Sequence, residues 1–149
     1  FNLVEGNRTD ECSAGALVTS GDDARLPIEF SRAIGNVLRH NSFVRSRTDG
    51  VLVTSRKPGA DDPAPSIAGT LVEFNIVRDA PVAYRSGPSS DAAVFRRNHA
   101  YFWNPIPSGK EIGFKIERPS GAVTVDENTV EGAVGELRPK GVVEVERAE

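Results

Sequence analysis

The stretch that decides the fold is Gly69–Trp103, "GTLVEFNIVRDAPVAYRSGPSSDAAVFRRNHAYFW". Its first nine residues, "GTLVEFNIV", alternate apolar and polar side chains with a period of two, which is typical of a half-buried β-strand. The turn "SGPSSD" then separates the two apolar runs "PVAYR" and "AAVFRRNHAYFW". Short runs rich in valine and aromatic residues, bounded by glycine, proline and serine, predict a chain built from β-strands.

The same pattern continues on both sides of this stretch. Downstream, "EIGFKIE" (111–117) places Ile112, Phe114 and Ile116 on one face, and "GAVTVD", "EGAVGEL" and "GVVEVE" follow. Upstream, "SFVRSR" and "VLVTSR" flank "TDG", which predicts a hairpin with glycine at the tight position. Strands at this spacing favour an antiparallel sandwich or barrel. The sequence shows no recognisable internal repeat.

One segment, residues 28–39, instead predicts an amphipathic helix. Its apolar residues recur with the 3.6-residue period of a helix, while its polar residues fall on the opposite side. The apolar set is Ile28, Phe30, Ala33, Ile34, Val37 and Leu38. We expect Phe30, Ile34, Val37 and Leu38 to be buried against the sheet. The predicted fold class is therefore α+β, mostly antiparallel β, with one helix near residues 28–39.

The length of 149 residues predicts a single domain, 1–149. Residues 1–13 are expected to form an irregular lead-in, and the stretch 57–66, rich in proline and aspartate, is expected to form a loop. The single cysteine, Cys12, excludes a disulfide within the monomer, and two histidines are too few for a histidine-rich metal site. We predict no metal and no cofactor. No run of 18 apolar residues is present, so we expect a soluble chain that does not enter a membrane.

Basic residues concentrate in the region 32–57, which holds six bases and one acid, a net charge of +5 in a chain whose total is −3. Arginine binds phosphate through two parallel hydrogen bonds, so this region is a possible phosphate-binding surface. The arginines concerned are Arg32, Arg39, Arg45, Arg47 and Arg56. The other interpretation is a solvated face whose long side chains cover the edge of the core.

Part of this region, "FSRAIGNVLRHNS", resembles the start of RNA 2′-phosphotransferases, over about a dozen residues. The resemblance implies a catalytic arginine at Arg39 and a functional histidine at His40. The family carries lysine where this chain has Arg32, and its later motifs are missing here. The "EVE" at 144–146 is similar to a motif of ADP-ribosyltransferases. Together these resemblances give one alternative function, a small enzyme that acts on an RNA or nucleotide phosphate.

Aromatic residues gather in the stretch 95–103. Read as one extended strand, it places His99, Tyr101 and Trp103 on one face, and Phe102 on the other, in the core. Large side chains on both faces require a cover for the first face, either a partner subunit or the predicted helix. Aromatic residues between arginines also stack on bases, so a nucleic-acid-binding β-barrel that uses this strand is a further alternative.

No residue set predicts a catalytic centre, and no catalytic residue is assigned apart from the Arg39 and His40 alternative. We therefore expect a non-enzymatic, β-rich interaction or assembly protein, such as a capsid-decorating or tail-associated component of a virion. Its partners would be protein subunits in a homo-oligomer or a virion lattice, with nucleic acid a possible partner at the basic patch. The expected interface residues are Tyr101, Trp103 and His99.

Overall fold

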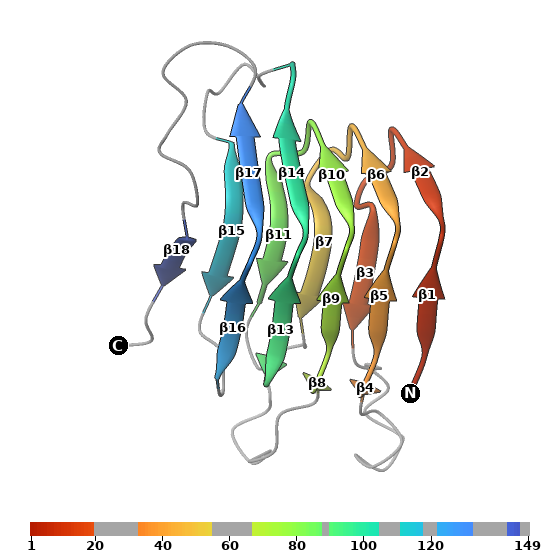
Figure 1. Cartoon of the computed structure of the whole chain (residues 1–149), viewed down its shortest axis with the longest axis vertical. Helices are drawn as coiled ribbons and strands as arrows, with labels where there is room; N and C mark the ends of the chain where they lie inside the picture. Colours follow the sequence, from red (N-terminus) through yellow and green to blue (C-terminus); the bar gives the residue numbers. More distant parts are fainter. Residues whose placement is uncertain are drawn as a thin grey trace.

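The computed structural model describes residues 1–19, 33–54, 67–87, 90–104, 111–117, 122–132 and 143–146. Within these residues the regular structure is all β, and every paired strand runs parallel to its neighbours in one of four sheets. The chain winds through the sheets in turn, so that each circuit forms one coil stacked on the last (Figure 1). This is a parallel β-helix, a solenoid in which each coil contacts its neighbours.

The sheets are named here A to D. Sheet A contains β1 (Leu3–Glu5), β5 (Val37–Arg39), β9 (Leu71–Glu73), β13 (Ala93–Arg96) and β16 (Val123–Asp126). Sheet B contains β2 (Arg8–Asp10), β6 (Ser42–Val44), β10 (Ile76–Arg78), β14 (His99–Phe102) and β17 (Thr129–Gly132). Sheet C contains β3 (Ala16–Thr19), β7 (Asp49–Thr54), β11 (Val82–Ser86), β15 (Ile112–Glu117) and β18 (Val143–Glu146). Sheet D contains β4 (Ala33–Ile34), β8 (Ile67–Ala68) and β12 (Ser90–Asp91).

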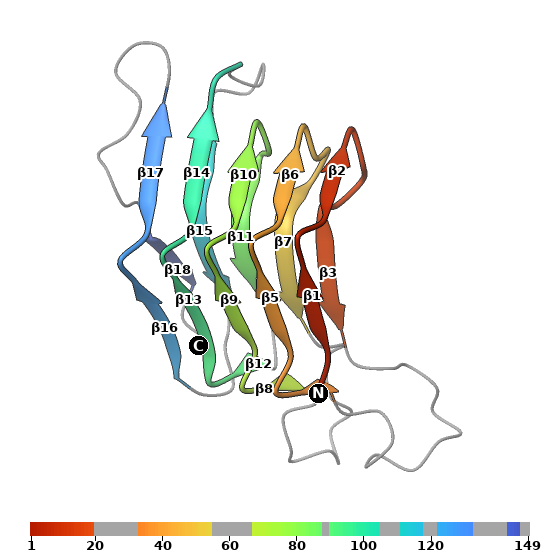
Figure 2. The same ribbon diagram turned by 45° about the vertical axis from the view of Figure 1, so that its right-hand side comes forward.

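Strands of sheets A and B follow one another with a bend between them, and those of sheet C run back in the opposite direction (Figures 1 and 2). The bend is made by a residue with left-handed backbone geometry just before an asparagine. The five residues at this corner are Gly6, His40, Phe74, Arg97 and Glu127, with φ between 50° and 69°. Only Gly6 adopts this geometry without steric cost, so the other four need support from elsewhere in the fold.

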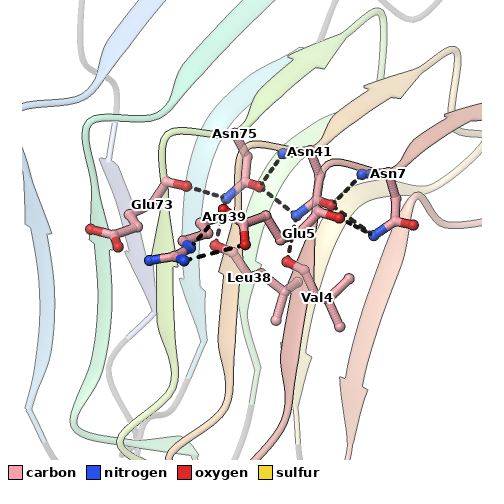
Figure 3. A network of polar contacts seen from close by, with 8 residues as sticks. All are labelled: Val4, Glu5, Asn7, Leu38, Arg39, Asn41, Glu73 and Asn75. Carbon is pink, nitrogen blue, oxygen red and sulfur yellow. Dashed lines mark hydrogen bonds and ion pairs between the residues drawn. The ribbon is translucent and has the colours of Figure 1, made fainter.

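That support comes from the asparagine ladder, which consists of Asn7, Asn41, Asn75, Asn98 and Asn128. The Oδ1 atom of Asn75 accepts hydrogen bonds from the Asn41 backbone N–H at 3.0 Å and from its Nδ2 at 2.9 Å. In turn, Nδ2 of Asn75 donates to the Leu38 carbonyl oxygen at 2.9 Å, one coil back (Figure 3). The same pattern joins Asn7 to Asn41, Asn75 to Asn98, and Asn98 to Asn128. Each amide thereby satisfies backbone groups that the corner would otherwise leave buried and unpaired.

The ladder shows that the chain does contain an internal repeat, contrary to the sequence-based interpretation. Successive ladder asparagines are 34, 34, 23 and 30 residues apart. The period is irregular because the coils differ in length between their strands. Only the short strands and the corners recur, so similarity over a whole coil is lost.

The core lies inside the coils, where side chains from equivalent positions stack on one another. The rings of Tyr84 and Phe114 stack at 4.9 Å between centroids, and Phe95 meets both edge-on. Tyr84 is fully buried, and its hydroxyl donates to the carbonyl oxygen of Asn75 at 2.8 Å. The burial expected for Phe102 is confirmed, and Phe114 and Ile116 are buried as well, whereas Ile112 of the same predicted face is half-buried. Burial raises the pKa of the Tyr84 hydroxyl well above its usual range.

The predicted antiparallel sandwich or barrel is wrong. Strand β6 pairs with β2 and β10, whereas β7 pairs with β3 and β11, so "SFVRSR" and "VLVTSR" do not form a hairpin with each other. Gly50 of the "TDG" signal lies inside β7, where an added Cβ would come within 2.6 Å of the Ala83 carbonyl oxygen. This glycine is therefore explained by the close approach of the next coil.

The predicted helix at 28–39 is also wrong over the residues that the structure describes. Residues 33–39 form β4 and β5, separated by a corner at Gly35 with φ of 66°. Leu38 is buried, but Ile34 is 52% exposed. Phe30 and the rest of 28–32 lie outside the described residues. The apolar spacing resembled a helix because a corner interrupts the alternation of two short strands.

Charges on the outer face of sheet A alternate in sign from coil to coil. The in-register row is Glu5, Arg39, Glu73, Arg96 and Asp126. Arg39 Nε lies 3.0 Å from Glu5, and Arg96 lies 2.8 Å from Glu73. Opposite charges on adjacent strands stabilise their pairing, and the exposed Arg39–Glu5 pair contributes less than about 1 kcal/mol.

A second group of charges lies on sheet C, where Asp49 Oδ1 is 2.8 Å from Nε of Arg85. Arg85 also lies 3.7 Å from Glu117. Burial raises the pKa of Asp49 above its ordinary value, and the Arg85 guanidinium opposes that rise without cancelling it. Asp49 is therefore a carboxylate whose ionised form is penalised by the fold.

We predict that Asn75→Ala destabilises the protein by about 2–5 kcal/mol, because it leaves the Asn41 N–H and the Leu38 carbonyl buried without partners. Asn7→Ala is the matched control, because Asn7 lies at the exposed end of the ladder. Its cost should stay below about 1 kcal/mol. Urea unfolding of both variants measures the difference. Equal effects would show that the ladder does not hold the coils together.

We also predict a pH-dependent effect of Asp49→Asn on stability. Because the folded-state pKa of Asp49 is raised, its contribution to stability is complete below its ordinary pKa and is lost as the pH rises through the folded value. Lowering the pH from 7 to about 3 should therefore raise the free energy of unfolding of the wild-type protein relative to that of the variant. Urea unfolding across this range tests the sign, and a shift in the opposite direction would contradict the burial argument.

Candidate interaction surface

The expected interface residues gather at the end of β14. Ala100 and Phe102 point into the core, while His99 and Tyr101 lie on the outer face of sheet B, their rings stacked at 3.7 Å between centroids. Trp103 follows the strand and is 67% exposed. The predicted 95–103 strand is in fact two strands, β13 and β14, separated by the corner at Arg97.

Asp79, from the neighbouring coil, holds Trp103 in place. Its Oδ1 accepts hydrogen bonds from the Trp103 backbone N–H at 2.6 Å and from the Asn104 N–H at 2.8 Å. Asp79 itself is buried and has left-handed geometry, with φ of 56°. The exposed indole is thus carried on a backbone fixed by two charge-assisted hydrogen bonds.

A groove of about 380 Å³ runs across the coils beside these aromatic residues. It is lined by Arg8, Ser42, Val44, Ile76, Arg78, Tyr101 and Trp103. Ile76 is 45% exposed, so the groove joins large apolar surface to two arginine side chains. A smaller hollow of about 140 Å³ lies on the other side of Tyr101, where Glu131 approaches His99 at 3.3 Å.

The sequence pattern did not indicate Arg8, Ser42, Ile76 and Arg78 as part of this surface, because they lie far from Tyr101 along the chain. A signal was available, since Arg8, Ser42, Ile76 and His99 each directly follow a ladder asparagine. In parallel coils in register, residues at equivalent positions lie side by side. Recognising the repeated asparagine would therefore have predicted this row.

The arginines of the basic region do not converge on one site. Arg39 lies on sheet A beside Glu5, whereas Arg45 lies at the corner after β6, 2.7 Å from Asp10 and 3.2 Å from Glu11. Arg47 is exposed on the link between β6 and β7. Arg32 and Arg56 lie outside the described residues. The described arginines are thus dispersed, two of them within ion pairs.

His40, the histidine of the phosphotransferase resemblance, is engaged in a stack at the corner between sheets A and B. Its ring lies 5.1 Å from that of Phe74, with 5° between the planes, and Arg97 lies 5.7 Å from the Phe74 ring on the next coil. Both contacts continue the coil-to-coil stacking on the outside of the fold. The "EVE" at 144–146 belongs to β18, whose backbone pairs with β15.

The described part of the chain contains no cluster of three or more histidine, cysteine, aspartate or glutamate side chains placed to hold a metal ion. Within the same residues no helix has the length and apolar character needed to cross a membrane. Among the described residues, the surface around Tyr101 and Trp103 combines an exposed tryptophan with a groove lined by two arginines.

No protein-family model, curated protein or solved structure matches this chain.

Proposed function

We propose that this chain is a non-enzymatic interaction and assembly protein whose binding surface is the outer face of sheet B around Tyr101 and Trp103. The observation that carries the proposal is the exposure of Trp103, 67% of whose surface meets solvent although its backbone is fixed by Asp79. Tryptophan, tyrosine and arginine are the residues most enriched at the centres of protein interfaces. This surface brings together all three.

The rigidity of the coil stack supports the same proposal. Neighbouring coils are joined by the ladder and by parallel strand pairing in four sheets, so side chains on the outer face are held at spacings of about 4.8 Å. A surface that is ordered before binding loses little conformational entropy when a partner covers it. We propose a virion component, capsid-decorating or tail-associated, as the setting, because such assemblies require rigid modules with lateral protein contacts.

An enzyme acting on an RNA or nucleotide phosphate has less support. Arg39 is paired with Glu5, and His40 is stacked against Phe74, so both side chains are already engaged. Nucleic-acid binding at the aromatic surface is also less favoured, because Asp10 and Glu131 share the face with Arg8 and Arg78. A polyanion would meet charges of both signs there.

We predict that Trp103 is accessible to solvent in the isolated monomer. Its fluorescence should show the red-shifted emission of a hydrated indole and strong quenching by acrylamide, because no described side chain covers most of its surface. Trp103 is the only tryptophan, so the signal needs no assignment. N-acetyl-tryptophanamide provides the fully exposed reference. Blue-shifted, quencher-protected emission from a dilute sample of verified monomeric mass would overturn the proposed surface.

A further inference from the structure

The outer face of sheet B carries two rows of side chains in register across the coils. The first row is Arg8, Ser42, Ile76, His99 and Thr129. The second row is Asp10, Val44, Arg78, Tyr101 and Glu131. The row between them points inward, and its central members Phe43, Val77 and Ala100 are buried. The first coil thus presents a base in one row and an acid in the other.

The middle coils of the same face combine exposed apolar side chains with the polar side chains of Ser42, Arg78 and His99. Ile76 is 45% exposed, and Tyr101 and Trp103 border the groove beside it. Large apolar side chains exposed next to one another mark a surface that is covered in the functional state. The charged first coil and the exposed Ile76 and Trp103 together form a pattern that a partner of this face must match.

We infer that a second copy of this chain covers this face, related by a two-fold axis parallel to the coil stack; this inference rests on the proposed function. Such an axis places each coil opposite the same coil of the second copy and exchanges the two rows. Arg8 then lies opposite the second copy's Asp10, and the symmetry generates this ion pair twice. In the fourth coil, Tyr101 lies opposite the second copy's His99.

A second two-fold arrangement also keeps the coils in register, with its axis parallel to the strands. It places the first coil of one copy opposite the fifth coil of the other, and the charges that then meet are unfavourable. It places Asp10 opposite Glu131 of the second copy and Arg78 opposite its own symmetry mate. Like charges brought together at an interface are strongly unfavourable and are a common means of excluding wrong partners. Charge complementarity therefore selects the arrangement in which the coils of both copies run in the same direction.

The size of the face indicates a reversible dimer. Five coils at a spacing of about 4.8 Å extend over about 19 Å, and the two rows lie about 7 Å apart. The two rows thus cover an area below that of stable, specific interfaces, so the dimer should be weak and form only at high protein concentration. Arg8 and Asp10 lie at the edge of the contact, where ion pairs determine specificity more than affinity.

Sedimentation equilibrium of the full chain between about 1 μM and about 1 mM tests this inference. We expect the average mass to rise from 16.0 kDa toward twice that value as concentration increases. Arg8→Asp and Asp10→Arg should each weaken association by about tenfold, because each places like charges opposite one another. The double variant R8D/D10R exchanges the charges and should restore association. Arg45 keeps Glu11 as a partner when Asp10 is replaced.

Two further variants complete the design. In the third coil the same axis places Ile76 opposite the second copy's Arg78, so Ile76→Arg should abolish association by bringing like charges together. Thr124→Arg, at an exposed position on the outer face of sheet A, adds the same charge elsewhere and should leave association unchanged. Urea midpoints close to wild type for these variants would show that the fold is intact.

The outcomes separate this inference from the proposed function. A chain that stays monomeric at every concentration but has an exposed Trp103 overturns the second copy and leaves the proposed surface standing. A monomer with a shielded Trp103 overturns both. A dimer that is unaffected by R8D and D10R overturns the two-fold arrangement, whereas loss in the single variants and recovery in the double variant supports it.

Discussion

The hydrogen bonds of one asparagine in each coil, buried in the three internal coils, determine the geometry of the other parts of the structure. In each internal coil, the amide of the ladder residue reaches a backbone carbonyl of the coil before and the ladder oxygen of the coil after. These bonds hold the preceding residue in left-handed geometry even where it is histidine, phenylalanine or arginine. The resulting bend keeps sheets A and B in register along the stack. The charge row on sheet A and the aromatic face of sheet B both follow from that register.

The strands themselves could be predicted from the sequence, but their pairing could not. Alternation of apolar and polar residues in "EIGFKIE" identifies Phe114 and Ile116 as core residues in either a parallel or an antiparallel sheet. The direction of pairing depends on what connects the strands, and several of those connections are long and irregular in sequence. The false helix at 28–39 has another cause. Ile34 is exposed and Val37 is half-buried, but both are apolar, and with the inward Ala33 and Leu38 they give a helical spacing across the corner at Gly35.

A recurring triplet contained the missing information. "EGN", "RHN", "EFN", "RRN" and "DEN" each place a charged residue two positions before a ladder asparagine. The triplet is too short and too variable to stand out when the spacing between copies changes from 34 to 23 residues. Recognised together, the triplets would have predicted coils, parallel pairing and the row that follows each asparagine. The aromatic residues of the sheet B surface were predictable from local sequence. Placing Arg8 and Arg78 beside them required knowledge of the strand register.

The alternation of charge along sheet A distinguishes a neighbouring coil from the coil beyond it. In the native order, Glu5 meets Arg39, Arg39 meets Glu73, and Arg96 lies between Glu73 and Asp126. If a coil were skipped while the chain wound up, β5 would lie against β13 and Arg39 would meet Arg96. Skipping the preceding coil would place Glu5 against Glu73 in the same way. Strands of nearly equal length and similar composition would otherwise pair almost as well with a strand two coils away. The charge row therefore disfavours any arrangement in which a coil is skipped.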